Sequence, residues 1–131
     1  MAKHITEILK EHDLDVEVGI HVVDTAFESH LVNGDDPTFA ILLDYDALPE
    51  IGHSCGHSVM AATGLSAYLA LAALIRKNPY SFKCTLKYII TPAEEGSSGK
   101  EVMARGGAFK PEYLDACIMV HSCGYDLTDQ V

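Results

Sequence analysis

The chain has 131 residues, enough for one ordinary domain, and its 48% apolar and 21% charged residues are typical of a globular protein. This apolar content excludes a mainly disordered chain, because enough side chains can be buried to offset the entropy lost on folding. The formal net charge is -10, from 9 basic and 19 acidic residues. No run of Lys or Arg forms a basic stripe, so a nucleic acid is a poor partner.

The first residues lack the apolar core of a secretory signal and carry acidic residues early, so we expect a cytoplasmic protein. The four cysteines are Cys55, Cys84, Cys117 and Cys123. In a cytosolic chain, thiols serve packing, metal binding or catalysis more often than disulfides. Cys84 and Cys117 lie in apolar, strand-like runs and are predicted to be core residues.

The first part of the chain predicts a helix followed by three strands. Residues 3–12 place apolar side chains at helical spacing, which indicates a short amphipathic helix. Alternating apolar residues predict a strand over 16–22, and a second strand is expected over 26–32. The continuous apolar run 39–43 ends at Asp44 and suits a strand that is buried on both faces.

The stretch from Ser58 to Ile75 contains no charged residue and follows a Gly- and Pro-containing loop at 49–57. About 18 apolar residues can span a bilayer, so a membrane helix is one interpretation. The other is a long buried helix of a globular domain. We favour the buried helix, because the stretch is barely long enough to span and includes Ser, Thr, Gly and Tyr.

The last part predicts two further strands, at 82–90 and 114–120. Between them lie a loop at 91–96 and a short helix at 99–106. Strands that alternate with helices predict an α/β fold with a layered, largely parallel sheet flanked by helices.

Residues that could bind a metal ion or move a proton follow three of the predicted strands. Asp44 and Asp46 follow one strand, Glu94 and Glu95 follow another, and His121 follows the last. In open α/β sheets, functional groups collect at the carboxyl ends of the strands. Each group also has an ordinary explanation, because aspartates often cap turns and paired glutamates often lie on the surface.

A further group, His53, Cys55 and His57, lies in the loop before the long helix. The helix N-terminus would favour a thiolate at Cys55. Thiolate, imidazole and carboxylate are the ligands of zinc and similar ions, but the spacing is not that of a zinc finger. The residues alone leave a metal site and a structural role open. The candidate ligands of the whole chain are spread over separate strand ends and this loop, and such a distribution favours a catalytic metal site.

Four segments, in order along the chain, carry a resemblance to a known family. They are Thr-Ala-Phe at 25–27, Leu-Asp-Tyr-Asp-Ala-Leu-Pro at 43–49, Gly-His-Ser-Cys-Gly-His at 52–57 and Thr-Pro-Ala-Glu-Glu-Gly at 91–96. Together they resemble the dinuclear zinc metallopeptidases and amidohydrolases of the aminoacylase, hippurate hydrolase and aminobenzoyl-glutamate hydrolase group. The resemblance covers nearly the whole chain and corresponds to the N-terminal part of that family's catalytic domain.

The resemblance implies that two divalent ions, zinc or manganese, are held by four side chains: Cys55, His57, Glu95 and His121. It implies that Glu94 is the general base and that Asp46 orients a ligand from outside the metal shell. More distant members carry a metal-binding His at the place of Asp44, whereas in this branch the Cys-Gly-His loop supplies two ligands. The chain departs from many relatives at Ser58 and Glu50, and Cys123 lies two residues after His121.

The implied activity is metal-dependent hydrolysis of an amide bond in N-acyl or N-aroyl amino acids or small dipeptides. The implied partners are a small amide substrate and a second copy of the chain in a homo-oligomer, without nucleic acid or membrane. Residues 1–131 would form a partial catalytic domain without the lid and dimerisation domain, so we expect little activity from this chain by itself. The alternative is a non-catalytic metal-binding fragment or a degenerate homologue.

Overall fold

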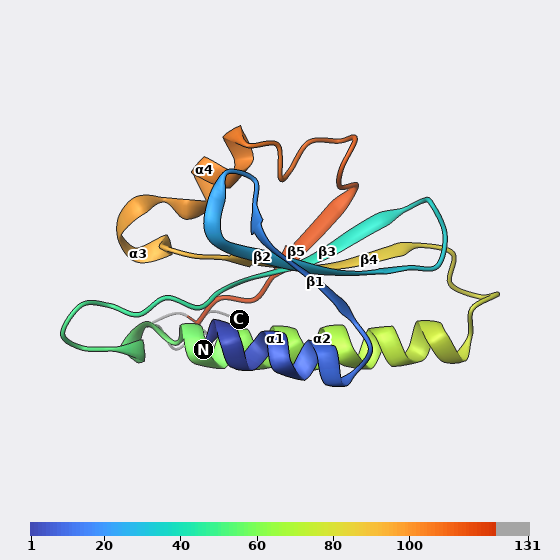
Figure 1. Ribbon diagram of the computed structural model, residues 1–131, viewed down its shortest axis with the longest axis horizontal. Helices are drawn as coiled ribbons and strands as arrows, with labels where there is room; N and C mark the ends of the chain where they lie inside the picture. The colour runs from blue at the N-terminus through green and yellow to red at the C-terminus, as the bar shows by residue number, and fades with distance from the viewer. Residues whose placement is uncertain (123–131) are drawn as a thin grey trace, which may run out of the picture.

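A computed structural model describes residues 1–122 of the chain. A five-stranded sheet lies between two layers of helices (Figure 1). The elements in chain order are α1 (Ala2–Glu11), β1 (Asp15–Ile20), β2 (Val23–Val32), β3 (Thr38–Asp44), the 3-10 helix η1 (His53–Cys55), α2 (His57–Lys77), β4 (Thr85–Thr91), α3 (Glu94–Ser97), α4 (Gly99–Arg105) and β5 (Ala116–Met119). The predicted α/β class, with a layered sheet flanked by helices, is confirmed.

The strand order is β1-β2-β4-β3-β5, and the sheet is mixed. β3 lies in parallel between β4 and β5, whereas β2 is antiparallel to both β4 and β1. The largely parallel arrangement is therefore restricted to β4, β3 and β5. The antiparallel pairing of β1 with β2 follows from the two-residue connection His21-Val22, in which both residues have positive φ, because so short a turn joins only antiparallel strands.

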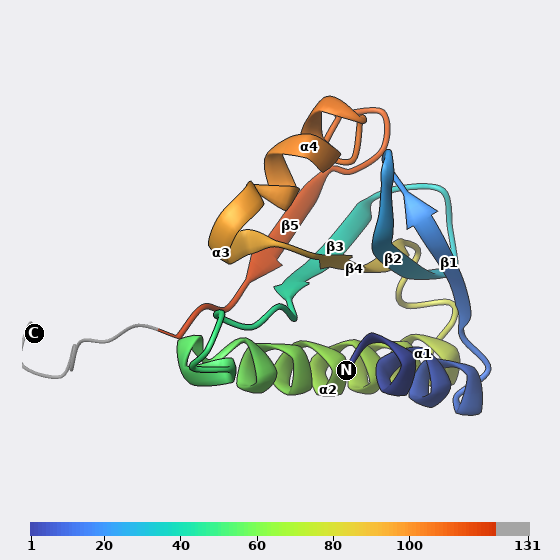
Figure 2. The same ribbon diagram turned by 60° about the vertical axis from the view of Figure 1, so that its left-hand side comes forward.

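Helices α1 and α2 cover one face of the sheet, and α3 and α4 lie on the other (Figure 2). On the first face, Tyr68 of α2 stacks on Tyr88 of β4 with ring centroids 5.2 Å apart, and both side chains are fully buried. On the second face, Met103 of α4 packs in the same cluster as Ile89. Each such fully buried apolar side chain contributes about 1.5–3 kcal/mol to folding. These two cores hold the strands in place, and the candidate site lies at the carboxyl ends of three of them.

Helix α2 is the one helix in residues 1–122 that is long and apolar enough to cross a membrane by length and composition. One face of it is buried, through residues such as Ala61, Leu65 and Ala72. That face belongs to the core cluster that includes strands of the sheet. Core helices of globular proteins pass the same test, and 39% of the apolar window of α2 is buried within residues 1–122.

Two details of the sequence interpretation are wrong. Cys84 is half-buried, but Cys117 is exposed, because β5 is the edge strand of the described sheet. Its neighbours Ile118 and Val120 are 53% and 62% exposed. The strand predicted from residue 82 begins at Thr85 instead, because the side-chain amide of Asn33 donates hydrogen bonds to carbonyl groups in the preceding turn.

Candidate metal centre and catalytic site

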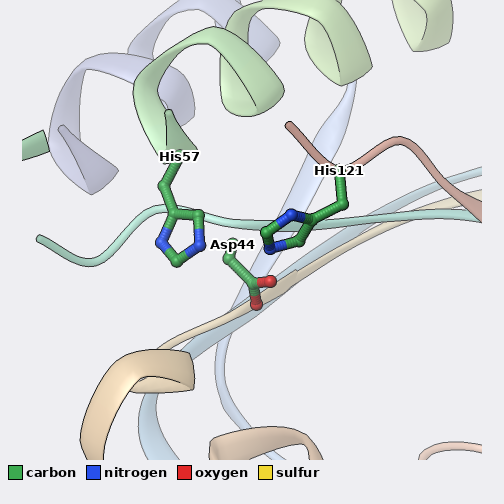
Figure 3. Close-up of side chains that lie close together, drawn as sticks. All are labelled: Asp44, His57 and His121. Atoms are coloured by element: carbon green, nitrogen blue, oxygen red, sulfur yellow. The ribbon is translucent and has the colours of Figure 1, made fainter. Parts of the chain in front are cut away.

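Three parallel strands direct their carboxyl ends to one edge of the sheet. Asp44 is the last residue of β3, Glu94 and Glu95 begin α3 just after β4, and His121 follows β5. The first residue of α2, His57, lies beside them. The close-up in Figure 3 shows Asp44, His57 and His121 converging from a strand end, a helix start and the segment after β5. The predicted grouping of these residues is therefore present in the fold.

His57 is a fully buried imidazole whose two ring nitrogens have different surroundings. Its Nδ1 atom lies 3.1 Å from the carbonyl oxygen of Asp46. A carbonyl only accepts, so Nδ1 carries the proton and Nε2 presents a lone pair. Nε2 is buried without a hydrogen-bond partner among residues 1–122, 3.7 Å from Oε2 of Glu94 and 3.9 Å from Oε1 of Glu95. A buried ring nitrogen that faces two carboxylates without a hydrogen bond is well placed to bind a cation together with them.

Cys55 completes a set of possible ligands with His57 and Glu95. One ligand atom from each of these three residues lies within 4.8 Å of the others. Cys55 is half-buried, and its Sγ lies 3.9 Å from the carbonyl oxygen of Asp46. Thiolate, imidazole and carboxylate together suit a borderline divalent cation such as zinc. The residues present therefore fit the metal that the sequence motifs imply.

Asp46 connects the two sides of this site. Its Oδ2 accepts a hydrogen bond of 3.0 Å from the backbone N–H of Glu95, and its Oδ1 lies 3.1 Å from Nδ1 of His57. Asp46 thus contacts two candidate ligands: the imidazole ring of His57 and the backbone N–H of Glu95. Asp46 lies beside the candidate ligands and not among them, where a side chain can orient a metal ligand.

His121 lies at the exposed side of the site. Its ring meets that of His57 edge-on, with centroids 5.5 Å apart and an angle of 88° between the planes. The next residue, Ser122, donates a hydrogen bond of 2.7 Å to the carbonyl oxygen of Cys55. A side chain at Gly56, whose φ is +86°, would overlap Ser122. The glycine between the two candidate ligands thus permits the close approach that brings His121 to the loop.

Asp44 has a partner that the sequence interpretation missed. The carboxylate is fully buried, and Nζ of Lys100 lies 2.7 Å from Oδ1 and 2.6 Å from Oδ2. The hydroxyl of Thr91 also donates to Oδ1. The signal that could have indicated such a partner is the burial itself, because a charge at the end of a buried strand needs a counter-charge. Cys123 lies outside the described residues.

A cavity of about 580 Å³ lies in another part of the molecule and has a different character. It is lined by β1, β2 and β4 and contains Glu28, Lys87 and Tyr113. The hydroxyl of Tyr113 donates to the carboxylate of Glu28, and Nζ of Lys87 lies 3.8 Å from Oε1 of Glu28. Desolvation lowers the pKa of Lys87. Nε2 of His21 also lies in this cavity, 3.9 Å from Oε2 of Glu28 and without a hydrogen-bond partner among residues 1–122. We place the candidate site at the strand ends because a thiol, an imidazole and a carboxylate come together there.

The chain is similar to known proteins in both sequence and fold. The family described as peptidase family M20/M25/M40 matches residues 40–131. The Xaa-Arg dipeptidase of Mus musculus is 40% identical over 82 residues, which are 63% of this chain and 19% of that protein. A p-aminobenzoyl-glutamate hydrolase polypeptide of Escherichia coli is 28% identical over 92% of this chain and 27% of its own length.

A solved structure from Bacillus subtilis, described as a dinuclear metal-binding peptidase of the M20 family, shares the fold with a TM-score of 0.72. It is 23% identical, and the match covers 93% of this chain and 36% of that one. The chain thus spans between about a fifth and a little over a third of the length of these proteins.

Proposed function

Since the chain belongs to peptidase family M20/M25/M40, we propose that it forms part of a metal-dependent amidohydrolase. The observation that carries the proposal is the buried Nε2 atom of His57, which has no hydrogen-bond partner in the described part of the chain and faces Glu94 and Glu95. The proposed substrates are N-acyl or N-aroyl amino acids or small dipeptides. The names of the dipeptidase and aminobenzoyl-glutamate hydrolase relatives support this class.

The proposed cofactors are two divalent ions, zinc or manganese. Their proposed ligands are Cys55, His57, Glu95 and His121, and the description of the Bacillus subtilis structure as a dinuclear metal-binding peptidase supports the number of ions. When bound, such ions supply Lewis-acid activation of a water molecule and of the substrate carbonyl. The donor atoms of Cys55, His57 and Glu95 already lie within 4.8 Å of one another, so little rearrangement is needed to hold an ion.

Glu94 is the proposed general base. Its side chain is 36% exposed, compared with 0% for His57, so it borders both the buried ligand and the solvent from which substrate enters. In the proposed reaction the carboxylate accepts a proton from the attacking water and later delivers it to the leaving nitrogen. A carboxylate that is ionised at rest can do both, because it acquires its proton within the reaction.

Substrate carboxylates are often bound by arginine, but both arginines of this chain have other partners. Arg76 donates to the carbonyl groups of His12 and Asp13, and Arg105 pairs with Glu101 at 2.6 Å. Both are exposed. The cytoplasmic location, the homo-oligomer and the absence of nucleic-acid and membrane partners remain proposals that rest on composition, charge and resemblance.

Titration of the chain with Co²⁺, a spectroscopic substitute for zinc, tests the metal centre. A thiolate ligand gives a sulfur-to-metal absorption band, which we expect in the wild type and in Cys84→Ser but not in Cys55→Ser. Cys84 is the matched control, because it is also half-buried but lies directly before β4. A folded wild-type chain that binds neither Co²⁺, Zn²⁺ nor Mn²⁺ would contradict the proposal.

The reaction itself is tested by amino-acid release from a panel of N-acyl amino acids, N-aroyl amino acids and dipeptides. We expect an active form of the protein to release the amino acid only when metal is present. Metal binding without hydrolysis of any panel member by a protein with its complete family domain would instead favour the non-catalytic alternative.

A further inference from the structure

Asp44 is a buried carboxylate whose two oxygens are both occupied by groups of the protein. The ammonium group of Lys100 lies 2.7 Å from Oδ1 and 2.6 Å from Oδ2, and the hydroxyl of Thr91 donates to Oδ1. Asp44 itself is 0% exposed, and the side chain of Lys100 is 29% exposed. This ion pair connects the start of α4 to the end of β3. The ammonium group of Lys100 therefore lies on the buried side of the candidate metal centre.

The same carboxylate is close enough to the histidines to serve as a metal ligand. One ligand atom each of Asp44, His57 and His121 lie within 4.8 Å of one another (Figure 3). A second set of comparable spacing consists of Cys55, His57 and Glu95. The two sets share His57, and one imidazole nitrogen binds one ion at a time. The ion that His57 holds can therefore lie either beside Asp44 and His121 or beside Cys55 and Glu95, and Lys100 already neutralises the carboxylate in the first of these places.

We propose that Lys100 is a positioning residue that acts as the built-in counter-ion of Asp44 and directs metal binding to the side of Cys55 and Glu95. The inference rests on the proposed function, because it concerns the same metal centre. The physical reason is charge. Without Lys100, Asp44 would present a bare negative charge beside His57 and attract a cation. Without Asp44, Lys100 would present a bare positive charge there and repel one.

An ion pair that merely stabilises the fold makes a different prediction. Loss of either partner would then weaken the packing of α4 on β3, and metal binding would decrease in both variants or in neither. Opposite changes in the two variants are expected only if the charges themselves act on the metal. The sign of each change therefore distinguishes a positioning role from a structural one.

The test uses three variants of the chain: Lys100→Met, Asp44→Asn and the double variant. Zn²⁺ affinity is measured by competition with a chelator, and Co²⁺ absorption reports whether the thiolate of Cys55 is a ligand. Lys77→Met is the matched control, because Lys77 is an exposed lysine at the far end of α2, about 30 Å along the helix from His57. Circular dichroism checks that each variant is folded.

We expect Lys100→Met to bind Zn²⁺ about tenfold more tightly and Asp44→Asn to bind about tenfold more weakly, the scale found for groups next to metal ligands. The double variant should return to near wild-type affinity, because both charges are removed together. In Lys100→Met the Co²⁺ thiolate band should weaken, since part of the metal moves towards Asp44. Lys77→Met should match the wild type.

The outcomes separate this inference from the proposed function. If the folded wild type binds no metal, the metal centre itself is wrong. If it binds metal but both single variants change affinity in the same direction, or neither changes it, the role of Lys100 is wrong and the metal centre stands. If Lys100→Met fails to fold, Asp44→Asn and the double variant decide, because affinity must be reduced in the first and restored in the second.

Discussion

The Nδ1 atom of His57 lies 3.1 Å from the backbone carbonyl oxygen of Asp46 and 3.1 Å from Oδ1 of the same residue. This double contact fixes the imidazole so that Nε2 faces the carboxylates of Glu94 and Glu95. Because the carbonyl belongs to the backbone, the tautomer of His57 is set by the path of the chain after β3. The side chain of Asp46 adds a negative charge that strengthens Nε2 as a donor to a cation.

Replacing Asp46 with Ala should therefore weaken metal binding without abolishing it. The backbone contact to Nδ1 remains, but the carboxylate near the ring and the hydrogen bond to the N–H of Glu95 are lost. We expect Zn²⁺ affinity to fall about 10–100-fold, the usual effect of removing such a partner. Asp24→Ala is the control, because Asp24 is exposed on β2. Equal affinity in the wild type and Asp46→Ala would show that the side chain plays no part.

Glu94 and Glu95 are adjacent and lie at similar distances from Nε2 of His57, so substitution separates their roles. In an active form of the protein, Glu94→Gln should retain its metal and lose about 10²–10⁴-fold in turnover, because Gln has the same shape but cannot accept a proton. Glu95→Gln should lose metal as well as activity. Turnover and metal content are measured on the same samples, and the opposite pattern would mean that the two roles are reversed.

Buried tyrosines make stability depend on pH under alkaline conditions. Burial raises the pKa of Tyr68 to about 12, whereas an unfolded tyrosine titrates near 10. Below pH 10 the phenol is protonated in both the folded and the unfolded chain, so its full contribution to the free energy of unfolding is present. Between pH 10 and about 12 only the unfolded chain releases the proton, so stability falls as pH rises. The difference between the two pKa values corresponds to roughly 2–3 kcal/mol in the free energy of unfolding.

Tyr68→Phe tests this dependence. At pH 8 the variant should be less stable by about 1 kcal/mol, because the 3.1 Å hydrogen bond with Ser29 is lost. Above pH 10 it should lose less stability than the wild type, so that the difference shrinks or changes sign. Urea unfolding at pH 8, 9.5 and 11 measures it. Tyr80→Phe is the matched control, since Tyr80 is 91% exposed. If the stability of Tyr68→Phe fell with rising pH as steeply as that of the wild type, Tyr68 would not be the cause of the dependence.

The sequence indicates which of these side chains come together where a polar residue directly follows a strand. Asp44 ends a strand of buried apolar residues, Glu94 follows the buried strand β4, and His121 follows the apolar but exposed strand β5. Parallel strands bring such endings to one edge, so a pattern along the chain becomes a cluster in space. The Cys-Gly-His loop before a long uncharged helix is similarly local. These features depend on residues that are neighbours in sequence, which is why a single sequence suffices to indicate them.

The features that the sequence does not predict depend on contacts between distant segments. The ion pair of Lys100 with Asp44 requires α4 to fold back over the end of β3, and no periodicity encodes that placement. The exposure of Cys117 follows from the edge position of β5, which is a property of strand order. The antiparallel pairing of β1 and β2 follows from a turn at His21 that lacks the usual Asn-Gly residues.

Two glycines in the segment that carries Glu94 and Glu95 offer a final, paired test of how the backbone positions the site. A Cβ atom at Gly99 would overlap the carbonyl oxygen of Pro92, whereas a Cβ at Gly96 would meet no atom of residues 1–122 within 4 Å. The overlap involves backbone atoms on both sides, so it can be relieved only if the loop between β4 and α4 moves. That loop contains both glutamates.

Gly99→Ala should therefore destabilise the chain by about 1–3 kcal/mol, the usual cost of overpacking, and should also weaken Zn²⁺ binding, because Glu95 moves relative to His57. Gly96→Ala should bind Zn²⁺ like the wild type and be equally or slightly more stable, since Ala favours the helical backbone of α3. Thermal unfolding and chelator competition measure the two quantities. Unchanged affinity in a destabilised Gly99→Ala would show that the loop can shift without disturbing the metal ligands, and that His57 and Cys55 dominate binding.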